Sequence, residues 1–301
     1  MSEPGIQFFN RYTSQIETES VYGENWLKFI LFNPFGKLAL HTIVKRDWFS
    51  HWYGSRMGSS QSRERVEPFI EKFGINEKEH LKEVSQYTSF NDFFYRKLKP
   101  EARPVDAATD SVVFPADGRH LGFAKASEVE GVFVKGQKFD LERLLGNPDL
   151  AAQFADGSAV FSRLCPVDYH RFHFPVSGVP GNARLINGQL YSVNPLALRD
   201  RLAILWENKR FITEIDTKEV GKVLMLEIGA TNVGSVNLTY VPTRPVKKGE
   251  EKGYFAFGGS ATFTIFEPGR VKLADDLLEQ SAQQRELYAK VGDCMGTFTA
   301  R

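Results

Sequence analysis

The sequence has little cysteine and almost no net charge. Its two cysteines, Cys165 and Cys294, form neither a CxxC pair nor a disulfide framework among the 301 residues, which favours a reducing compartment. The 38 Lys and Arg residues and the 37 Asp and Glu residues leave a formal net charge of +1. Proteins that bind nucleic acids usually carry a clear basic excess, so no nucleic-acid partner is expected.

The sequence also lacks an apolar run long enough to cross a bilayer. Lys28 and Lys37 interrupt its most apolar region, residues 25–44. A transmembrane helix needs about 20 apolar residues in succession, so this region cannot form one. The first residues, MSEPGIQFFN, contain no charged segment followed by an apolar one, and no secretory signal is readable.

Residues 24–60 nevertheless combine aromatic side chains with a basic excess. They hold five Lys or Arg residues against two Asp or Glu residues, and Trp48, Trp52 and Tyr53 accompany the cations. This mixture is typical of an amphipathic segment that lies on an anionic lipid surface. An ordinary pair of core helices, broken at Asn33 and Pro34, explains the same residues equally well.

The chain changes character near residue 100. Residues 1–98 read as mostly helical, and Ser89 with Asp92 has the pattern of a capping box before a short helix. Residues 99–104 contain two prolines and read as a linker. Runs typical of strands then follow, separated by glycine and proline, at 112–115, 159–164, 210–215, 222–228, 235–241 and 261–266.

Two helical stretches interrupt these strands, at residues 140–154 and 274–291. The predicted fold class is therefore α+β. Residues 1–105 form a helical, membrane-associating N-terminal region, and residues 106–301 form a β-rich domain that resembles a sandwich or barrel.

Three short segments of the β-rich domain carry reactive side chains. The first is the Gly-Gly-Ser sequence that ends at Ser260, a kink between two extended stretches. Glycine leaves the Gly259 carbonyl unshielded by a Cβ atom, so the Ser260 hydroxyl is placed to attack its own preceding peptide bond. A plain glycine-rich turn is the simpler explanation of this motif alone.

The second segment, DYHRFHFP, contains two of the six histidines, His170 and His173. Histidine is the natural proton carrier near neutral pH. In an extended strand the two rings would point to opposite faces, so a shared site requires a bend. No further metal-ligand motif accompanies them, and no metal is expected. One core and one surface histidine also explain this segment alone.

The third segment, FPADG, places Asp117 in a turn after a strand. Asp-Gly is first of all a turn signal. A carboxylate at a strand end also orients the histidine in Ser-His-Asp arrangements. Each of these three signals is weak alone, and their presence together calls for a single explanation.

Blocks of sequence spread in order over residues 85–290 resemble the phosphatidylserine decarboxylases. They are SFNDFFYRKLKPEARPVD at 89–106, FPADG at 114–118, CPVDYHRFHFPVSG at 165–178, INGQLYSVNP at 186–195, ENKR at 207–210, IGATNVGSV at 228–236 and KKGEEKGYFAFGGS at 247–260. Many members carry Leu-Gly-Ser-Thr at the processing site. The Gly-Gly-Ser of this chain resembles another branch of the family, and Ala261 after the serine departs from the pattern.

The resemblance implies that the chain processes itself. In this family the serine, here Ser260, attacks the Gly259 carbonyl, while His173 takes its proton and Asp117 steadies the histidine. The chain then separates into a β chain, 1–259, and an α chain, 260–301, which remain associated. Ser260 becomes a pyruvoyl group, the covalent cofactor of the enzyme.

The resemblance also implies the reaction. The amine of phosphatidylserine condenses with the pyruvoyl group as a Schiff base, CO2 leaves, and phosphatidylethanolamine is formed. His170 maps to the residue that returns a proton. The expected enzyme is peripheral, on the cytoplasmic side of the cell membrane, and acts at an anionic lipid surface. Its oligomeric state stays open, a homodimer included.

Three other functions remain as alternatives. A serine hydrolase would use Ser260, His173 and Asp117 on an external substrate, but no G-x-S-x-G elbow precedes a helix here. A non-catalytic membrane-surface module would keep the histidines for structure alone. A pyruvoyl decarboxylase of a soluble amino acid would not need the aromatic, basic N-terminus. Electrophoresis distinguishes these functions. Either pyruvoyl decarboxylase should appear as two chains, whereas the serine hydrolase and the non-catalytic module should appear as one intact chain.

Overall fold

The computed structural model describes residues 6–19, 33, 47–129, 139–230, 236–257 and 260–299. Most of the predicted membrane-surface segment, residues 24–46 apart from Asn33, lies outside the described residues. Gly259, on one side of the predicted cleavage site, also lies outside them, whereas Ser260 is described.

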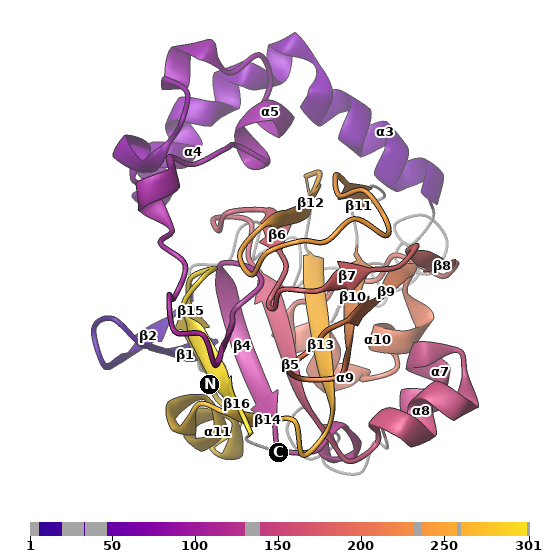
Figure 1. Ribbon diagram of the computed structural model, residues 1–301. Coiled ribbons are helices and arrows are strands. Elements are labelled where there is room, and N and C mark those ends of the chain that lie inside the picture. Colours follow the sequence, from indigo (N-terminus) through magenta and orange to yellow (C-terminus); the bar gives the residue numbers. More distant parts are fainter. Residues whose placement is uncertain are drawn as a thin grey trace.

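A ten-stranded sheet forms the centre of the protein (Figure 1). Its strands follow the order β2-β1-β15-β4-β5-β13-β10-β9-β7, and β8 also pairs with β9. The pairing is antiparallel except between β1 and β15, which are parallel. The strands are β1 (Gln7–Asn10), β2 (Gln15–Thr18), β4 (Gly118–Phe123), β5 (Gly157–Leu164), β7 (Val179–Pro180), β8 (Arg184–Ile186), β9 (Arg210–Asp216), β10 (Lys222–Gly229), β13 (Ser260–Pro268) and β15 (Glu286–Ala289).

Two small sheets of three strands accompany the large one. The first has the order β11-β12-β6, and the second has the order β14-β16-β3. Their strands are β11 (Val236–Leu238), β12 (Glu251–Phe255), β6 (Arg171–His173), β14 (Val271–Leu273), β16 (Cys294–Phe298) and β3 (Ser111–Val113).

Strand β13 separates two apolar cores because its side chains alternate between the faces of the sheet. Phe263 and Ile265 belong to the core that also contains side chains of α7 (Leu141–Leu145), α8 (Pro148–Phe154), α9 (Pro195–Asp200) and α10 (Ile204–Glu207). Phe266, on the opposite face, shares the second core with Phe172 of β6 and Phe255 of β12. Ser260 lies six residues before Phe266, an even number, so the two side chains point to the same face of β13. That face is turned toward the β11-β12-β6 sheet, which carries His173.

A helical layer covers the β11-β12-β6 sheet at one end of the molecule (Figure 1). It consists of α3 (Asp47–Gly58), α4 (Val66–Phe73) and α5 (Phe90–Phe94), joined by the 3-10 turns η2 (Ser60–Arg65), η3 (Glu77–Glu79) and η4 (Val84–Gln86), with η5 (Pro100–Ala102) after them. These elements share a third core, rich in phenylalanine, that includes Phe257. Within the described ranges, no helix is both long and apolar enough to cross a membrane.

The start of α5 confirms half of the predicted capping box. The Ser89 hydroxyl accepts a hydrogen bond from the Asp92 N–H at 3.1 Å. The Asp92 carboxylate accepts from the N–H of Thr88, at 3.1 Å, instead of reaching back to Ser89. The helix is therefore closed by its serine cap, and the carboxylate stabilises the residue before that cap.

The strand-rich, mixed α/β class and the predicted strands are confirmed, and two helical predictions are wrong. Residues 7–18 form β1 and β2, because Phe8 is buried against β15 of the large sheet. The predicted helix at 274–291 ends early, since α11 covers only Asp275–Ala282. Gln284 then takes a positive φ of 56°, which breaks the helix, and β15 follows. The domain boundary at 105/106 stays a prediction.

Candidate active site

Ser260 is the first residue of β13 and lies at the centre of the large sheet. It pairs with Leu164 of β5 on one side and with Gly229 of β10 on the other. Its side chain is fully buried, and its hydroxyl has no hydrogen-bond partner among the described residues. A buried hydroxyl without a partner is costly, so this position calls for a functional explanation.

His173 ends β6, on the sheet that faces Ser260. Its Nδ1 lies 3.0 Å from the Gly249 carbonyl oxygen, while its buried Nε2 has no partner in the described part of the chain. Because a carbonyl oxygen only accepts, Nδ1 carries the proton and Nε2 keeps its lone pair. Burial lowers the pKa of His173, although the Gly249 carbonyl and nearby carboxylates act in the opposite direction. The ring is therefore neutral near pH 7 and has the form required of a base.

His170 has different neighbours from His173. It is fully buried, and its Nδ1 lies 3.0 Å from the carbonyl oxygen of Asp168. Its ring packs on Phe94 of α5, with the ring centroids 3.8 Å apart. Its own carbonyl accepts a hydrogen bond from the N–H of Phe255 at 2.9 Å. The two histidines are thus held by different contacts.

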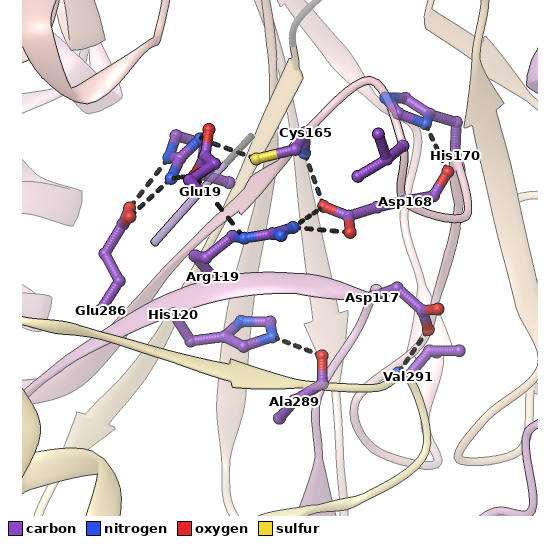
Figure 2. Close-up of polar contacts among 12 residues, drawn as sticks. Glu19, Asp117, Arg119, His120, Cys165, Asp168, His170, Glu286, Ala289 and Val291 are labelled. Atoms are coloured by element: carbon purple, nitrogen blue, oxygen red, sulfur yellow. Dashed lines mark hydrogen bonds and ion pairs between the residues drawn. The ribbon is translucent and has the colours of Figure 1, made fainter. Parts of the chain in front are cut away.

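Asp117, in the turn before β4, is buried and belongs to an ion pair. The Nη2 atom of Arg103 lies 2.6 Å from one carboxylate oxygen, and the Nε atom lies 2.9 Å from both. The N–H of Val291 donates to the same carboxylate at 2.9 Å (Figure 2). No hydrogen bond joins Asp117 to His173, both of which are described. The N–H of His173 nevertheless donates to the Pro115 carbonyl at 2.7 Å, which brings the two segments side by side.

A buried cluster of charged side chains lies beside the loop that joins β5 to His170 (Figure 2). Arg119 donates to both carboxylate oxygens of Asp168, at 2.5 and 2.6 Å. The same carboxylate accepts from the N–H of Cys165 at 2.7 Å, and Cys165 directly follows Leu164, the partner of Ser260. Asp168 and Arg119 therefore fix the loop that connects the strand beside Ser260 to His170.

The cluster continues to the N-terminal hairpin. Arg163 pairs with Glu286 and with Glu19, each at 2.6 Å, and Arg119 lies 3.6 Å from Glu19. Burial alone would raise the pKa of Glu19, but Arg163 and Arg119 hold it at about 2. Glu19 is separated from its partners by about a hundred residues or more, so no local pattern in the sequence could reveal this contact.

A further buried ion pair lies beside β13, two residues along from Ser260, and was also missed by sequence reasoning. Lys252 of β12 donates to Glu227 of β10 at 2.5 Å, and both side chains are fully buried. Glu227 is the cross-strand partner of Thr262, which is two residues from Ser260 on the same face of β13. This pair joins the sheet that carries His173 to the sheet that carries Ser260.

The described residues contain no group of three His, Cys, Asp or Glu side chains arranged to hold a metal ion. Cys165 is a buried free thiol, and Cys294 is a half-buried one. The hydroxyl of Ser260 and the imidazoles of His170 and His173 are groups that can accept and donate protons.

A sequence model described as phosphatidylserine decarboxylase matches residues 90–295 of this chain. The chain belongs to the phosphatidylserine decarboxylase family. It is 44% identical to a phosphatidylserine decarboxylase proenzyme of Fusobacterium nucleatum, over 97% of each chain. It is 45% identical to the proenzyme of Chlamydia muridarum, over 98% of each chain, and 41% identical to that of Chlamydia pneumoniae, over 96% of each.

These matches confirm the family that the sequence blocks indicated. The roles of the individual side chains in this family member stay predictions. The fold places Ser260 and His173 on facing sheets and brings the segment of Asp117 alongside that of His173. It does not join the three by hydrogen bonds.

Proposed function

We propose that this chain is a phosphatidylserine decarboxylase that matures by cutting itself between Gly259 and Ser260. The observation that carries the proposal is the Ser260 hydroxyl, which is fully buried, has no partner among the described residues, and follows two glycines. The close relatives are named as proenzymes, which supports a maturation step.

Self-cleavage begins when Ser260 Oγ attacks the Gly259 carbonyl carbon. His173 Nε2 takes the hydroxyl proton, since its lone pair is available. The C–N bond then breaks, and the peptide becomes an ester with a free amine at Ser260. Removal of the Ser260 Cα proton breaks the Cβ–Oγ bond and releases the Gly259 carboxylate. One water molecule then replaces the nitrogen of residue 260, which leaves as ammonia, and a ketone remains.

The surroundings of Ser260 fit the resulting pyruvoyl group. It keeps the three carbon atoms of the serine residue, so it needs no additional space. Gly229, the cross-strand partner on one side, has no side chain to crowd it. When present, the group supplies an electrophilic carbonyl that draws off the electron pair left by departing CO2. We assign to His170, oriented by the Asp168 carbonyl, the return of a proton to that carbon.

The strand order supports lasting association of the two chains after cleavage. In the proposed α chain, β13 lies between β5 and β10, and β15 lies between β1 and β4. All four neighbours belong to the proposed β chain. Separating the chains would therefore break the large sheet at two places.

We also propose that the enzyme is peripheral and acts on the cytoplasmic side of the cell membrane. On α3, Trp52 is half exposed, and the Arg56 guanidinium lies 5.4 Å from the centre of its ring. An aromatic side chain paired with a cation suits an anionic lipid surface. Wild type should sediment with anionic vesicles, and less so at high salt. The variant Trp52→Ser/Arg56→Ser should still cut itself, because it alters only side chains outside the shared core. Its binding to vesicles at the wild-type level would contradict this surface.

The activity is tested with purified protein and vesicles that contain phosphatidylserine. Wild type should release CO2 and form phosphatidylethanolamine, whereas Ser260→Ala should stay uncut and release none. Ser158→Ala is a matched control, because Ser158 is a buried serine of β5 whose hydroxyl already bonds the Val271 carbonyl. Release of CO2 from the lipid by uncut Ser260→Ala would refute the need for self-cleavage at Ser260. A cut wild type that releases no CO2 from the lipid would refute the decarboxylase activity.

A further inference from the structure

Helix α5 of the helical layer contacts the chain just before the proposed cleavage site. The side-chain oxygen of Asn91 accepts a hydrogen bond from the N–H of Phe257 at 2.9 Å. The Phe257 ring packs on Phe90 and Phe94, with centroid separations of 5.2 and 4.8 Å. Phe257 is itself almost fully buried. The backbone three residues before Ser260 is thus held by one turn of helix.

The other end of this short segment is fixed by the large sheet. Ser260 is paired on both sides, with Leu164 and with Gly229. Only Gly258 and Gly259 separate it in sequence from Phe257. Since glycine has the widest choice of backbone conformations, the direction of the Gly259 carbonyl depends on how firmly both ends are held.

Helix α5 is well suited to hold one of these ends. Its N–H groups are bonded at the start, Asp92 to the Ser89 hydroxyl at 3.1 Å and Phe90 to the Ser62 hydroxyl at 2.9 Å. The same helix supplies Phe94, which packs on His170. One short helix therefore contacts both the segment to be cut and one of the proposed proton-transfer residues.

We propose that Asn91 is a positioning residue for self-cleavage. Its side-chain oxygen binds the N–H of Phe257 and so fixes the orientation of that peptide group. The ring contacts of Phe257 hold its side chain in place but do not fix the direction of its N–H. That orientation sets the approach of the Gly259 carbonyl to the Ser260 hydroxyl. Reactions within one molecule are sensitive to such alignment, and small misplacements cost up to about a hundredfold in rate. The inference rests on the proposed self-cleavage.

The test compares the cleavage rates of newly synthesised protein in a cell-free system, with fragments identified by mass. Asn91→Leu keeps the size of the side chain but removes the acceptor, and it should cut itself about ten to a hundred times more slowly. Asn91→Asp keeps an acceptor oxygen and should cut at close to the wild-type rate. Ser89→Ala is the matched control, because it weakens the same helix at its cap without touching Phe257.

Each substitution is also made together with Ser260→Ala, so that folding is measured by thermal unfolding in a protein that cannot cut itself. The proposal predicts slow cleavage for Asn91→Leu alone, in a chain that unfolds no earlier than Ser89→Ala. Wild-type cleavage by Asn91→Leu would overturn it, as would equal slowing by Ser89→Ala. If wild type itself stays uncut, the proposed function fails rather than the role of Asn91.

Discussion

Arg103, and not His173, holds the carboxylate of Asp117. The guanidinium makes three contacts of 2.6 to 2.9 Å with the two carboxylate oxygens. Arg103 also pairs with Glu79 of η3, at 2.8 Å. Since Arg103 lies in the linker and Glu79 in the helical layer, a line of charges runs from that layer to the proposed catalytic carboxylate. The guanidinium thus fixes the orientation of the Asp117 carboxylate, which, within the described residues, makes no hydrogen bond with His173.

This ion pair predicts the effect of Arg103→Met on stability. The substitution leaves the buried Asp117 carboxylate with the Val291 N–H as its remaining bonded partner. Removing one member of a buried pair costs about 3–5 kcal/mol, and urea unfolding in a Ser260→Ala background measures it. The double variant Arg103→Met/Asp117→Asn should recover most of the loss. Equal unfolding midpoints for Arg103→Met and its parent would show that the pair adds nothing.

The different surroundings of the two histidines predict separate defects. His173→Ala should accumulate as the uncut chain, because the Ser260 hydroxyl is a poor nucleophile without a base. His170→Ala should be cut normally, yet decarboxylate phosphatidylserine about 10² to 10⁴ times more slowly. Electrophoresis and CO2 release measure the two steps independently. An uncut His170→Ala with a mature His173→Ala would mean that the roles are reversed.

Buried His120 predicts a loss of stability in acid. Burial lowers its pKa from near 6.5 to about 3. Its ring lies between the Ser162 hydroxyl and the Ala289 carbonyl, and Figure 2 shows the contact with Ala289. Below pH 6.5 the His120 ring binds a proton in the unfolded chain but stays neutral in the folded protein, so acid favours unfolding. The free energy of unfolding should fall by up to about 1.4 kcal/mol per pH unit from this group alone.

Measuring urea unfolding between pH 6.5 and 5 tests the contribution of His120, because most carboxylates are still ionised there. His120→Gln should be less stable at pH 7 but should have a shallower dependence on pH. His80, whose pKa burial lowers to about 4, and His173, whose pKa burial also lowers, should supply the slope that remains. An unchanged slope in His120→Gln would mean that this ring binds a proton as readily in the folded protein as in the unfolded chain.

The buried pair of Glu227 and Lys252 predicts a strong asymmetry between single and double variants. Lys252→Met leaves an unpaired carboxylate in the core and should destabilise the protein by about 3–5 kcal/mol. Glu227→Leu combined with Lys252→Met should recover most of that loss, because apolar residues pack where the ion pair was. Lys222→Met is the control: Lys222 lies on β10, like Glu227, and pairs with the partly exposed Glu214 of β9, so the substitution should cost about 1 kcal/mol or less. Equal losses in the single and double variants would contradict this account.

Local sequence patterns predicted six strands of the β-rich domain, among them its four longest, β5, β9, β10 and β13. Runs such as 222–228 and 261–266 were readable because turn residues bound them, and they became β10 and β13. Strand β1 was missed because its burial depends on β15, nearly 280 residues later. The end of α11 was missed because a single residue, Gln284, adopts a positive φ that its side chain does not favour.

The candidate site divides in the same way. Ser260, His170, His173 and Asp117 stood out because each lies in a short motif with reactive groups. Their partners did not, since the contacts of Arg103 with Asp117, Arg119 with Asp168 and Lys252 with Glu227 span 14, 49 and 25 residues, beyond the reach of a short motif. The link between Asn91 and Phe257 spans 166 residues. Such partners become visible only when the fold brings the strands and helices together.

The central claim is tested most directly by the intact mass of the purified protein, with a ketone-specific reagent applied to its fragments. The account predicts two fragments, residues 1–259 and residues 260–301. The smaller fragment should be blocked at its N-terminus and should react once with the reagent, at the position of Ser260. A single chain of the full mass would contradict the account, as would a cut fragment that begins with an unmodified serine.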